Sequence, residues 1–592
     1  MMAKRKKKNK ACPEARRVAG VVSGQRAQQH AGSTLHSHTV GAIPLLNRIM
    51  QRMQLEPLLR QHVPDKDRRT RPGTARVLTL LVSNLLVSRE PVYGVAEWAS
   101  RYAPDLFGLA PDDLERLNDD RLGRCLDRLF ATLDTDLVLA VVRQVVEEFQ
   151  VSLDELHNDS TTVSFYGSYP EAEQPHWILQ RLAPAITWGH SKDHRPDLKQ
   201  LLYTLTVTED GGVPVYFQAH SGNMTDDQTH QATWLLLRQL VGRPDFVYVA
   251  DCKLATTDNM NAIARQGGRF ISILPATRKE NTRFRQRLRQ QPDSVTWREL
   301  DQRRDEDDEV IDTLSVCTDE LLSAEGYRLY WILSTRKQEQ DAATRVSQTE
   351  RAIRHLLELR ERLCGPRTRF RQRDKVLQAV HEILQEYGVQ DWLQVEIEEV
   401  QRESYRQAHR GRPGKDTQFK RTVRTQYTIS WQIHAPALEE AARDDGVFPL
   451  ITNLQDWDAR QVLEAYKRQP IIEKRFSQLK TDFCVAPVYL KNVGRIVALL
   501  AVYFFALMVQ TLLERELRRA MKQQRRSTLP LYPEGRPCSR PTTRQVIDCL
   551  DTIQRHTLLR RGAEDELLVT DLSPLQRQLL TLLQLSPKNY GR

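Results

Sequence analysis

Residues 496–509 form an unbroken run of 14 apolar residues, and no other stretch limits the possible folds as strongly. A membrane-spanning helix needs about 20 such residues, and polar or charged residues close this run at both ends (Lys491 and Arg495 before it, Gln510 and Glu514 after it). We therefore expect a helix that is buried on all sides within a protein core, and no association with a membrane. The chain has 592 residues, of which 40% are hydrophobic, so it can build that core within three to five units.

The charge balance points to a polyanionic partner. The net charge is +11, and six of the positive charges lie in the first ten residues. Nucleic acid fits such a balance best and an anionic membrane second, while general solubility is the alternative explanation. Residues 1–39 are polar and basic, which predicts a disordered tail able to touch phosphates without sequence preference.

The eight cysteines are scattered, with no Cys-x2-Cys pair and no Cys/His cluster. This pattern argues against zinc ribbons and against a disulfide framework, and it favours a reducing compartment such as the cytoplasm.

Residues 40–150 are predicted to be helical. Residues 74–88 carry a dense apolar pattern, and Asn118 or Asp119 is a good cap for a further helix. Several short helices with tight turns suit a DNA-binding unit of the helix-turn-helix type, and they suit a plain helical bundle equally well.

Residues 151–280 change to strand-like runs. Two apolar runs, 201–207 and 213–219, flank Asp210-Gly-Gly212 and predict a hairpin. Helix-like and strand-like segments then alternate up to residue 274. The segment therefore predicts a mixed α/β sheet.

Two aspartates lie beside predicted strands. Asp251 follows the apolar strand 246–250, and Asp159 lies in or beside another strand. Carboxyl ends of strands are where α/β sheets place their ligands. Carboxylates gathered there would repel one another unless cations neutralised them, and oxygen ligands of this kind select Mg²⁺ or Mn²⁺.

A third carboxylate, Glu473, lies in a predicted helix. At 100° per residue, Tyr466, Gln469, Glu473 and Lys480 fall within about 60° of one another on its surface. Ile472, Phe476 and Leu479 lie on the opposite, packing side. Pro470 predicts that the helix begins or kinks there, which would place Tyr466 on a preceding turn. An amphipathic helix with a solvated charged face is the alternative.

These features together resemble a known family, the DDE transposases of bacterial insertion sequences (the IS-four-like group). That group carries its catalytic glutamate in a Tyr-x2-Arg-x3-Glu-x6-Lys helix, which Tyr466, Glu473 and Lys480 match, while Gln469 stands in the place of Arg. Asn158-Asp159-Ser-Thr-Thr162 and Tyr248-Val-Ala-Asp251 match the motifs of the two aspartates. The stretches 189–200 and 484–491 also look like the family.

The resemblance implies a ribonuclease-H-like α/β core that an insertion domain interrupts before the glutamate helix, preceded by a helical N-terminal domain. The expected organisation ends each part at a change in sequence character. Its parts are a tail (1–39), a helical and DNA-binding domain (40–150), the first part of the core (151–280), the insertion (281–455), the second part of the core (456–524) and a linker with C-terminal helices (525–592).

The resemblance also implies chemistry and partners. Asp159, Asp251 and Glu473 would be the catalytic, metal-binding residues, with two Mg²⁺ or Mn²⁺ ions per site for cleavage and strand transfer. The partners would be the terminal inverted repeats and the target, both double-stranded DNA, bound by a homodimer. A bacterial cytoplasmic location, at the nucleoid when on DNA, follows.

Other residues carry weaker expectations. Tyr466 and Lys480 would hold phosphates, although a salt bridge to Glu473 or a neighbour is the alternative for Lys480. Arg410-Gly-Arg412-Pro has the core of an AT-hook and would contact DNA, either in a minor groove or as a flexible basic loop. His157 is expected to be structural, and four further aspartates are expected to be loop and cap residues (Asp193, Asp197, Asp226 and Asp227).

Two other functions remain open at this point. The chain would be a catalytically inactive DNA-binding protein derived from a transposase if the departure at Gln469 marks decay. It would be a non-mobile nuclease if the same core only hydrolyses DNA.

Overall fold

The computed structural model describes residues 33–592 except 66, 68, 306, 366–367, 483–489, 533, 561–565 and 591–592. The chain divides into two compact units. The first unit comprises residues up to Ile271 and from Ala465 onward, and the second comprises Ser272–Glu464. Most of the tail expected at 1–39, and most of the 484–491 motif, lie outside the described residues.

The first unit begins with a strand and a set of helices. Asn118 caps one helix by accepting a hydrogen bond from the backbone N–H of Arg121, as its sequence predicts. The elements are β1 (Ser33–Thr39), α1 (Ile43–Arg52), α2 (Leu55–His62), α3 (Thr74–Val87), α4 (Val95–Ser100), α5 (Pro111–Glu115), α6 (Asp119–Thr132) and α7 (Thr135–Phe149).

A mixed sheet follows in the same unit, as the sequence predicts. Its strands lie in the order β6-β5-β2-β7-β8. The β2–β5 and β5–β6 pairs are antiparallel, whereas β2–β7 and β7–β8 are parallel. The strands are β2 (Glu155–Phe165), β5 (Lys199–Thr208), β6 (Pro214–Ser221), β7 (Val247–Ala250) and β8 (Arg269–Ile273), with a small hairpin of β3 (His176–Ile178) and β4 (Arg181–Ala183). The connecting helices are α8 (His230–Val241) and α9 (Thr257–Arg265).

The apolar run lies in α16 (Val493–Gln523), which extends beyond the run at both ends. In the described part of the chain, α16 alone has the length and composition that could cross a membrane, and 94% of its most apolar window is buried inside the protein. Helices α3 and α6 pack against it. The expected buried core helix is therefore present.

The two ends of the first unit differ from expectation. Residues 33–39 were expected in a disordered tail, but they form β1, which pairs antiparallel with β16 (Gln554–Arg560). The C-terminal segment was expected to hold helices only, yet it adds β16 and β17 (Glu566–Val569) to α17 (Thr543–Leu550) and α18 (Pro574–Leu582). Backbone pairing between distant segments, which local patterns do not reveal, produces this small sheet.

The second unit combines a sheet with two helices, α11 and α12, and a long hairpin. Its strand order is β15-β12-β10-β9, and β11 also pairs with β12. Its elements are α10 (Lys279–Gln290), β9 (Trp297–Arg304), β10 (Val310–Cys317), β11 (Leu321–Leu322), β12 (Arg328–Ser334), α11 (Thr335–Cys364), α12 (Arg373–Tyr387), β13 (Leu393–Gln407), β14 (Phe419–Ile433), α13 (Ala435–Ala442) and β15 (Val447–Thr452). Helix α14 (Ala459–Lys467) carries the chain back into the first unit.

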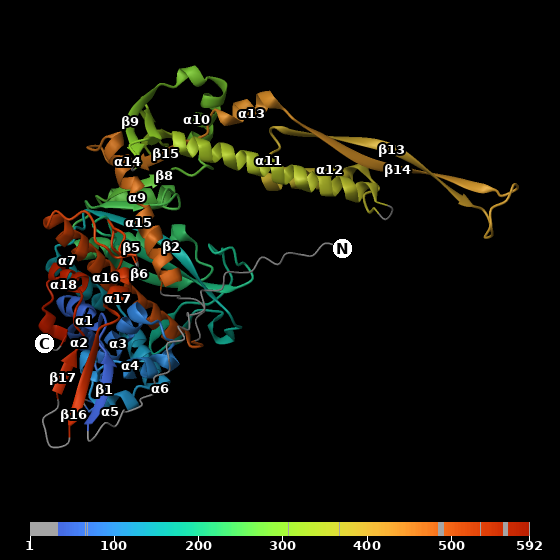
Figure 1. Cartoon of the computed structure of the whole chain (residues 1–592). Helices are drawn as coiled ribbons and strands as arrows, with labels where there is room; N and C mark the ends of the chain where they lie inside the picture. Colours follow the sequence, from blue (N-terminus) through green and yellow to red (C-terminus); the bar gives the residue numbers. More distant parts are fainter. Residues whose placement is uncertain are drawn as a thin grey trace. The chain divides into compact units, whose positions relative to one another are not determined.

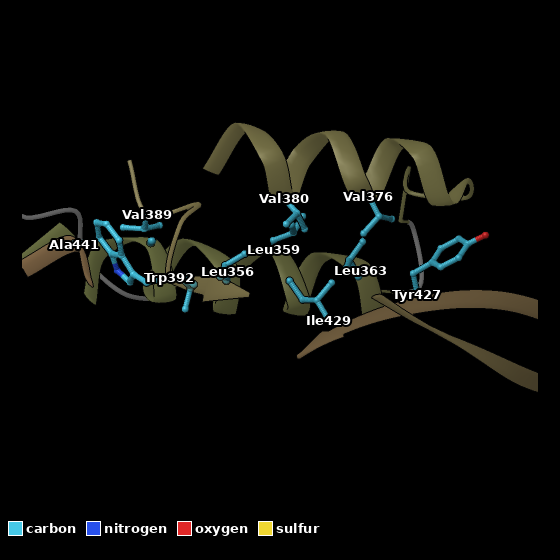
Figure 2. Close-up of a cluster of buried hydrophobic side chains, with 12 residues drawn as sticks. Leu356, Leu359, Leu363, Val376, Val380, Val389, Trp392, Tyr427, Ile429 and Ala441 are labelled. Atoms are coloured by element: carbon cyan, nitrogen blue, oxygen red, sulfur yellow. The ribbon is translucent and has the colours of Figure 1, made fainter. Parts of the chain in front are cut away.

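In the second unit, a separate apolar cluster joins α11 and α12 to the hairpin of β13 and β14 (Figure 2). Leu356, Leu359 and Leu363 of α11 face Val376 and Val380 of α12, and all five are buried. The inner ends of β13 and β14 contribute Leu393, Tyr427 and Ile429 to the same cluster.

The buried guanidinium of Arg475 fixes the segment that carries Glu473 to the sheet. Arg475, on α15 (Pro470–Ser477), is 1% exposed. Its guanidinium donates hydrogen bonds to the carbonyls of Gly211 and Gly212, whose positive φ angles form the β5–β6 turn, and lies 3.5 Å from the buried Glu514 of α16. One side chain therefore joins a turn, a helix and the central apolar helix.

We expect Arg475→Met to destabilise the first unit by about 3 kcal/mol, because the change removes the partner of a buried charge. Urea unfolding followed by circular dichroism measures the effect. Lys474→Met, on the exposed neighbouring residue, is the control and should change the unfolding free energy little. Equal effects of the two variants would contradict the role given to Arg475.

Candidate active site

Asp159 and Asp251 lie on two neighbouring parallel strands, Asp159 within β2 and Asp251 directly after the end of β7. β2 and β7 pair in register up to Asn158 and Ala250, and each aspartate is the next residue along its chain. The sheet therefore brings together two carboxylates that are 92 positions apart in the sequence.

Burial and mutual repulsion disfavour the charged form of both groups. Burial raises the pKa of the Asp251 carboxyl to about 6, and the nearby Asp159 adds to the shift. Burial also raises the pKa of Asp159, to which the charge of Asp226 contributes. The pair thus lacks part of the positive charge that would keep both carboxylates ionised.

A lysine that the sequence analysis did not single out supplies one positive charge. The Lys192 ammonium lies 2.9 Å from an oxygen of Asp226 and 3.4 Å from Oδ1 of Asp159, and it donates to the Ser160 carbonyl at 2.8 Å. Burial alone would lower the pKa of Lys192, but Asp159 and Asp226 outweigh it and the net shift is upward.

Asp226 was expected to be a loop or cap residue, and the structure gives it a second role. It begins the short 3-10 helix Asp226–Gln228, but its carboxylate accepts a hydrogen bond from the Ser160 hydroxyl at 2.5 Å and pairs with Lys192. Burial would raise the pKa of Asp226, but Lys192 and the Ser160 hydroxyl lower it by more. Asp226 thus belongs to the same group of interacting side chains as Asp159, Asp251 and Lys192.

The glutamate segment is not one continuous helix. Tyr466 lies on α14, Glu473 on α15 and Lys480 on a π-helical turn (Gln478–Asp482). Pro470 occupies the first turn of α15 and ends the preceding helix, as its missing N–H dictates. The single stripe of polar residues is therefore split over three segments, although Ile472, Phe476 and Leu479 are buried as predicted.

Tyr466 nevertheless lies close enough to three acids for their charges to affect its pKa. Burial raises the pKa of its hydroxyl strongly, and the charges of Asp251, Glu473 and Asp159 all contribute to the shift. The Glu473 side chain is exposed, whereas Asp159 and Asp251 are half-buried.

Gln469 is part of a buried hydrogen-bonded chain that ties this segment to β2. Its amide oxygen lies 2.8 Å from Nδ1 of His157, and its amide nitrogen donates to the Asn158 carbonyl. The other ring nitrogen of His157 lies 2.8 Å from Glu155, which Arg468 binds with two hydrogen bonds. Both ring nitrogens of His157 thus have protein partners, which fits the structural role predicted for it.

Lys480 forms an ion pair with a loop residue. Its ammonium lies 2.6 Å from Oδ1 of Asp193, whose other oxygen accepts a 3.4 Å hydrogen bond from Thr162 of β2. A salt bridge to a neighbour was one of the two alternatives for Lys480, and contact with phosphates stays a prediction. Asp197 pairs with Arg195 at the surface.

Arg410 and Arg412 belong to the second unit. Both are exposed in the loop that joins β13 to β14.

The donor set fits a divalent cation. Within the described ranges, no group of three or more His, Cys, Asp or Glu side chains has metal-binding geometry. Asp159, Asp226 and Asp251 nevertheless lie close enough to Lys192 and to one another for their charges to interact. A cation with oxygen ligands would neutralise part of this negative charge.

Sequence reasoning missed Lys192, Asp226 and the Glu155–Arg468 pair. Lys192 lies in the 189–200 stretch that resembles the transposase family, so that stretch could have indicated it. Nothing local marks Glu155, because its partner is 313 residues away.

Burial would raise the pKa of Glu155, but Arg468 and His157 lower it by more, so its folded pKa lies below the usual 4.5. Its contribution to stability is therefore present above pH 4.5 and is lost as the pH falls through the folded value. We expect Glu155→Gln to cost about 2 kcal/mol at pH 7 and progressively less below pH 4.5. Urea unfolding across pH tests this, with the exposed Glu147→Gln as control. A pH-independent difference would contradict it.

We expect Lys192→Met to lower the stability of the metal-free protein by about 1–2 kcal/mol, because Asp159 and Asp226 lose the ammonium that pairs with both. Added Mn²⁺ should then raise the unfolding temperature of this variant more than that of the wild type. Thermal unfolding with and without Mn²⁺ measures both effects. Lys522→Met, at an exposed lysine of α16, is the matched control.

Two family models match the sequence of this chain. The family model described as "Transposase DDE domain" matches residues 155–509, and the model described as "Domain of unknown function (DUF4277)" matches residues 35–143. None of the curated proteins matches the chain. A solved structure of a piggyBac transposase synaptic complex with hairpin DNA is similar over 49% of this chain and 60% of that one, at 10% identity and a TM-score of 0.27.

That similarity is too low to carry an argument, and this chain spans only 60% of the piggyBac chain. The transposase model, in contrast, covers more than half of the sequence and includes Asp159, Asp251 and Glu473. The protein therefore belongs to the family of transposases with a DDE domain.

Proposed function

We propose that the chain is an active transposase that binds the terminal inverted repeats of an insertion sequence and catalyses metal-dependent DNA cleavage and strand transfer. The single observation that carries this proposal is the register of β2 and β7, which places Asp159, within β2, beside Asp251, just after β7. Burial raises the pKa of Asp251 and the charge of Asp159 adds to the shift, so a bound cation would favour the ionised form of both groups.

Asp159, Asp251 and Glu473 are the residues that would hold two Mg²⁺ or Mn²⁺ ions. When bound, such a pair of ions activates a water or a 3′-hydroxyl and stabilises the leaving oxygen of an in-line displacement. Asp226 adds charge at the site through Ser160 and Lys192.

The remaining residues position the acids and the DNA. The Gln469–His157 contact holds the start of α15 against β2 and would thereby keep Glu473 near the two aspartates. Tyr466 lines the site beside them, and Lys480, held by Asp193, would exchange that carboxylate for a phosphate when DNA is present.

The sheet supports a ribonuclease-H-like core, since three antiparallel strands continue into two parallel ones with the aspartates on the central pair. Membership of the IS-four-like group rests on the spacing of Tyr466, Glu473 and Lys480. Gln469 departs from that group's Arg, and the neighbouring Arg468 is bound to Glu155.

Double-stranded DNA is the proposed partner, with two copies of the chain pairing the element ends. The net charge of +11 supports a polyanionic partner. Gln469 stands where the family pattern has Arg, and this departure favours one other candidate, an inactive DNA-binding protein derived from a transposase.

We expect the wild-type protein to cleave its own terminal-repeat DNA in the presence of Mg²⁺ and to join a pre-cut end to target DNA. Glu473→Gln and Asp251→Asn should lower both rates at least 1,000-fold, because each removes a proposed metal ligand (about 4 kcal/mol of transition-state stabilisation). Gel assays of nicking and strand transfer measure the rates. Glu464→Gln and Asp258→Asn, at exposed acids of α14 and α9, are matched controls.

The outcomes separate the candidates. Cleavage that survives Glu473→Gln would exclude the glutamate from the site. DNA binding without cleavage by the wild type would favour the inactive derivative, and cleavage without strand transfer would indicate a nuclease.

A further inference from the structure

The hairpin of the second unit is a long two-stranded ribbon. β13 and β14 pair over their whole length, from Leu393 opposite Ile433 to Gln407 opposite Phe419. Only the inner end of the ribbon packs on the helices, through Tyr427, Ile429 and their neighbours. The outer half extends beyond α11 and α12 (Figure 1), and its side chains are mostly exposed.

The register sorts the outer side chains onto two faces. Directly opposed residues share a face, and successive pairs alternate between faces. One face therefore carries three pairs in sequence, which are Arg402–Arg424, Ser404–Thr422 and Arg406–Lys420. We call this set of six residues the cationic face.

The cationic face places like charges directly opposite each other twice, which destabilises a ribbon in isolation. Within the described residues, none of its four cations has an ion pair, and Arg402 makes only a 3.5 Å hydrogen bond to Gln426. The opposite face differs, because its Arg421 is neutralised by Glu403. The positive charge is thus left uncompensated on one side only.

The charge is also confined to the outer part of the ribbon. Glu396 and Glu398 lie on the same face nearer the helices, whereas the loop at the tip adds Arg410, Arg412 and Lys415. The exposed apolar side chains of the outer half, Tyr405, Phe419 and Val423, lie on the other face. The cationic face therefore offers charges and hydroxyls, and the exposed Val400 borders it on the same side of the ribbon, toward the helices.

We propose that the cationic face binds the sugar-phosphate backbone of double-stranded DNA, so that the ribbon is a DNA-holding arm. Arginine matches phosphate oxygens with paired hydrogen bonds, and the hydroxyls of Ser404 and Thr422 can donate to phosphates between the cations. A two-stranded ribbon is also narrow enough for the major groove. The proposal rests on the proposed function and adds the surface that holds the DNA without reading its sequence.

The test compares two full-length variants with the same change in charge. The face variant carries Arg402→Gln, Arg406→Gln, Lys420→Gln and Arg424→Gln. The control carries Arg283→Gln, Arg298→Gln, Arg303→Gln and Arg336→Gln, four exposed arginines elsewhere in the second unit. The Kd for duplex DNA is measured in EDTA, where no cleavage occurs, at several salt concentrations.

We expect the face variant to lose at least tenfold in affinity for any duplex sequence, and the slope of log K against log salt to fall by about 3. The control should keep both values near those of the wild type. Replacing Arg402, Arg406 and Arg424 with Lys should preserve most of the salt slope. The face variant should unfold at the same temperature as the wild type or higher, because its like-charge pairs are gone.

Unchanged affinity in the face variant, with wild-type binding intact, would contradict DNA binding by the cationic face and leave the transposase proposal standing. Equal losses in the face variant and the control would show a general charge effect and would also contradict DNA binding by the cationic face. Absence of DNA binding by the wild type would instead overturn the proposed function. Binding of acidic polypeptide in preference to DNA would assign the face to a different partner.

Discussion

The hydrogen-bonded chain from Arg468 through Glu155 and His157 to Gln469 is the contact on which the geometry of the active site depends. It joins β2 to a segment 312 residues further along the chain, and it is buried at its centre. It fixes the start of α15 against the strand that carries Asp159. A charged Arg in the place of Gln469 would have to share this space with Arg468, so the departure from the family pattern suits the neighbouring residue.

The chemistry of the site and the stability of the fold make opposite demands. The sheet holds Asp159 and Asp251 side by side where burial raises the pKa of both. Lys192 relieves part of this repulsion, and the Arg475–Glu514 pair fixes the surrounding elements. A rigid frame around an electrostatically unfavourable pair is a common property of sites that bind cations, because it prevents the acids from moving apart.

The sequence predicted those parts of the structure that local patterns determine. The hairpin at 210–212, the strand that ends before Asp251 and the buried run in α16 all follow from hydrophobic periodicity and turn residues. The break at Pro470 follows from its missing N–H. The β1–β16 pairing, the Glu155–Arg468 pair and the Lys192–Asp226 contact could not be predicted, because each joins residues whose proximity only the folded chain creates.

Within the residues that the structure describes, the ribbon of β13 and β14 pairs with no third strand, so both of its long edges present unpaired backbone N–H and C=O groups. Such edges are templates for pairing with another copy of the chain, and proteins commonly guard them with charge. Repulsion between the rows of Arg402, Arg406, Lys420 and Arg424 on two ribbons would keep them apart. The cations that we assign to DNA would thus also act as gatekeepers against self-association, so that screening them exposes the chain to aggregation.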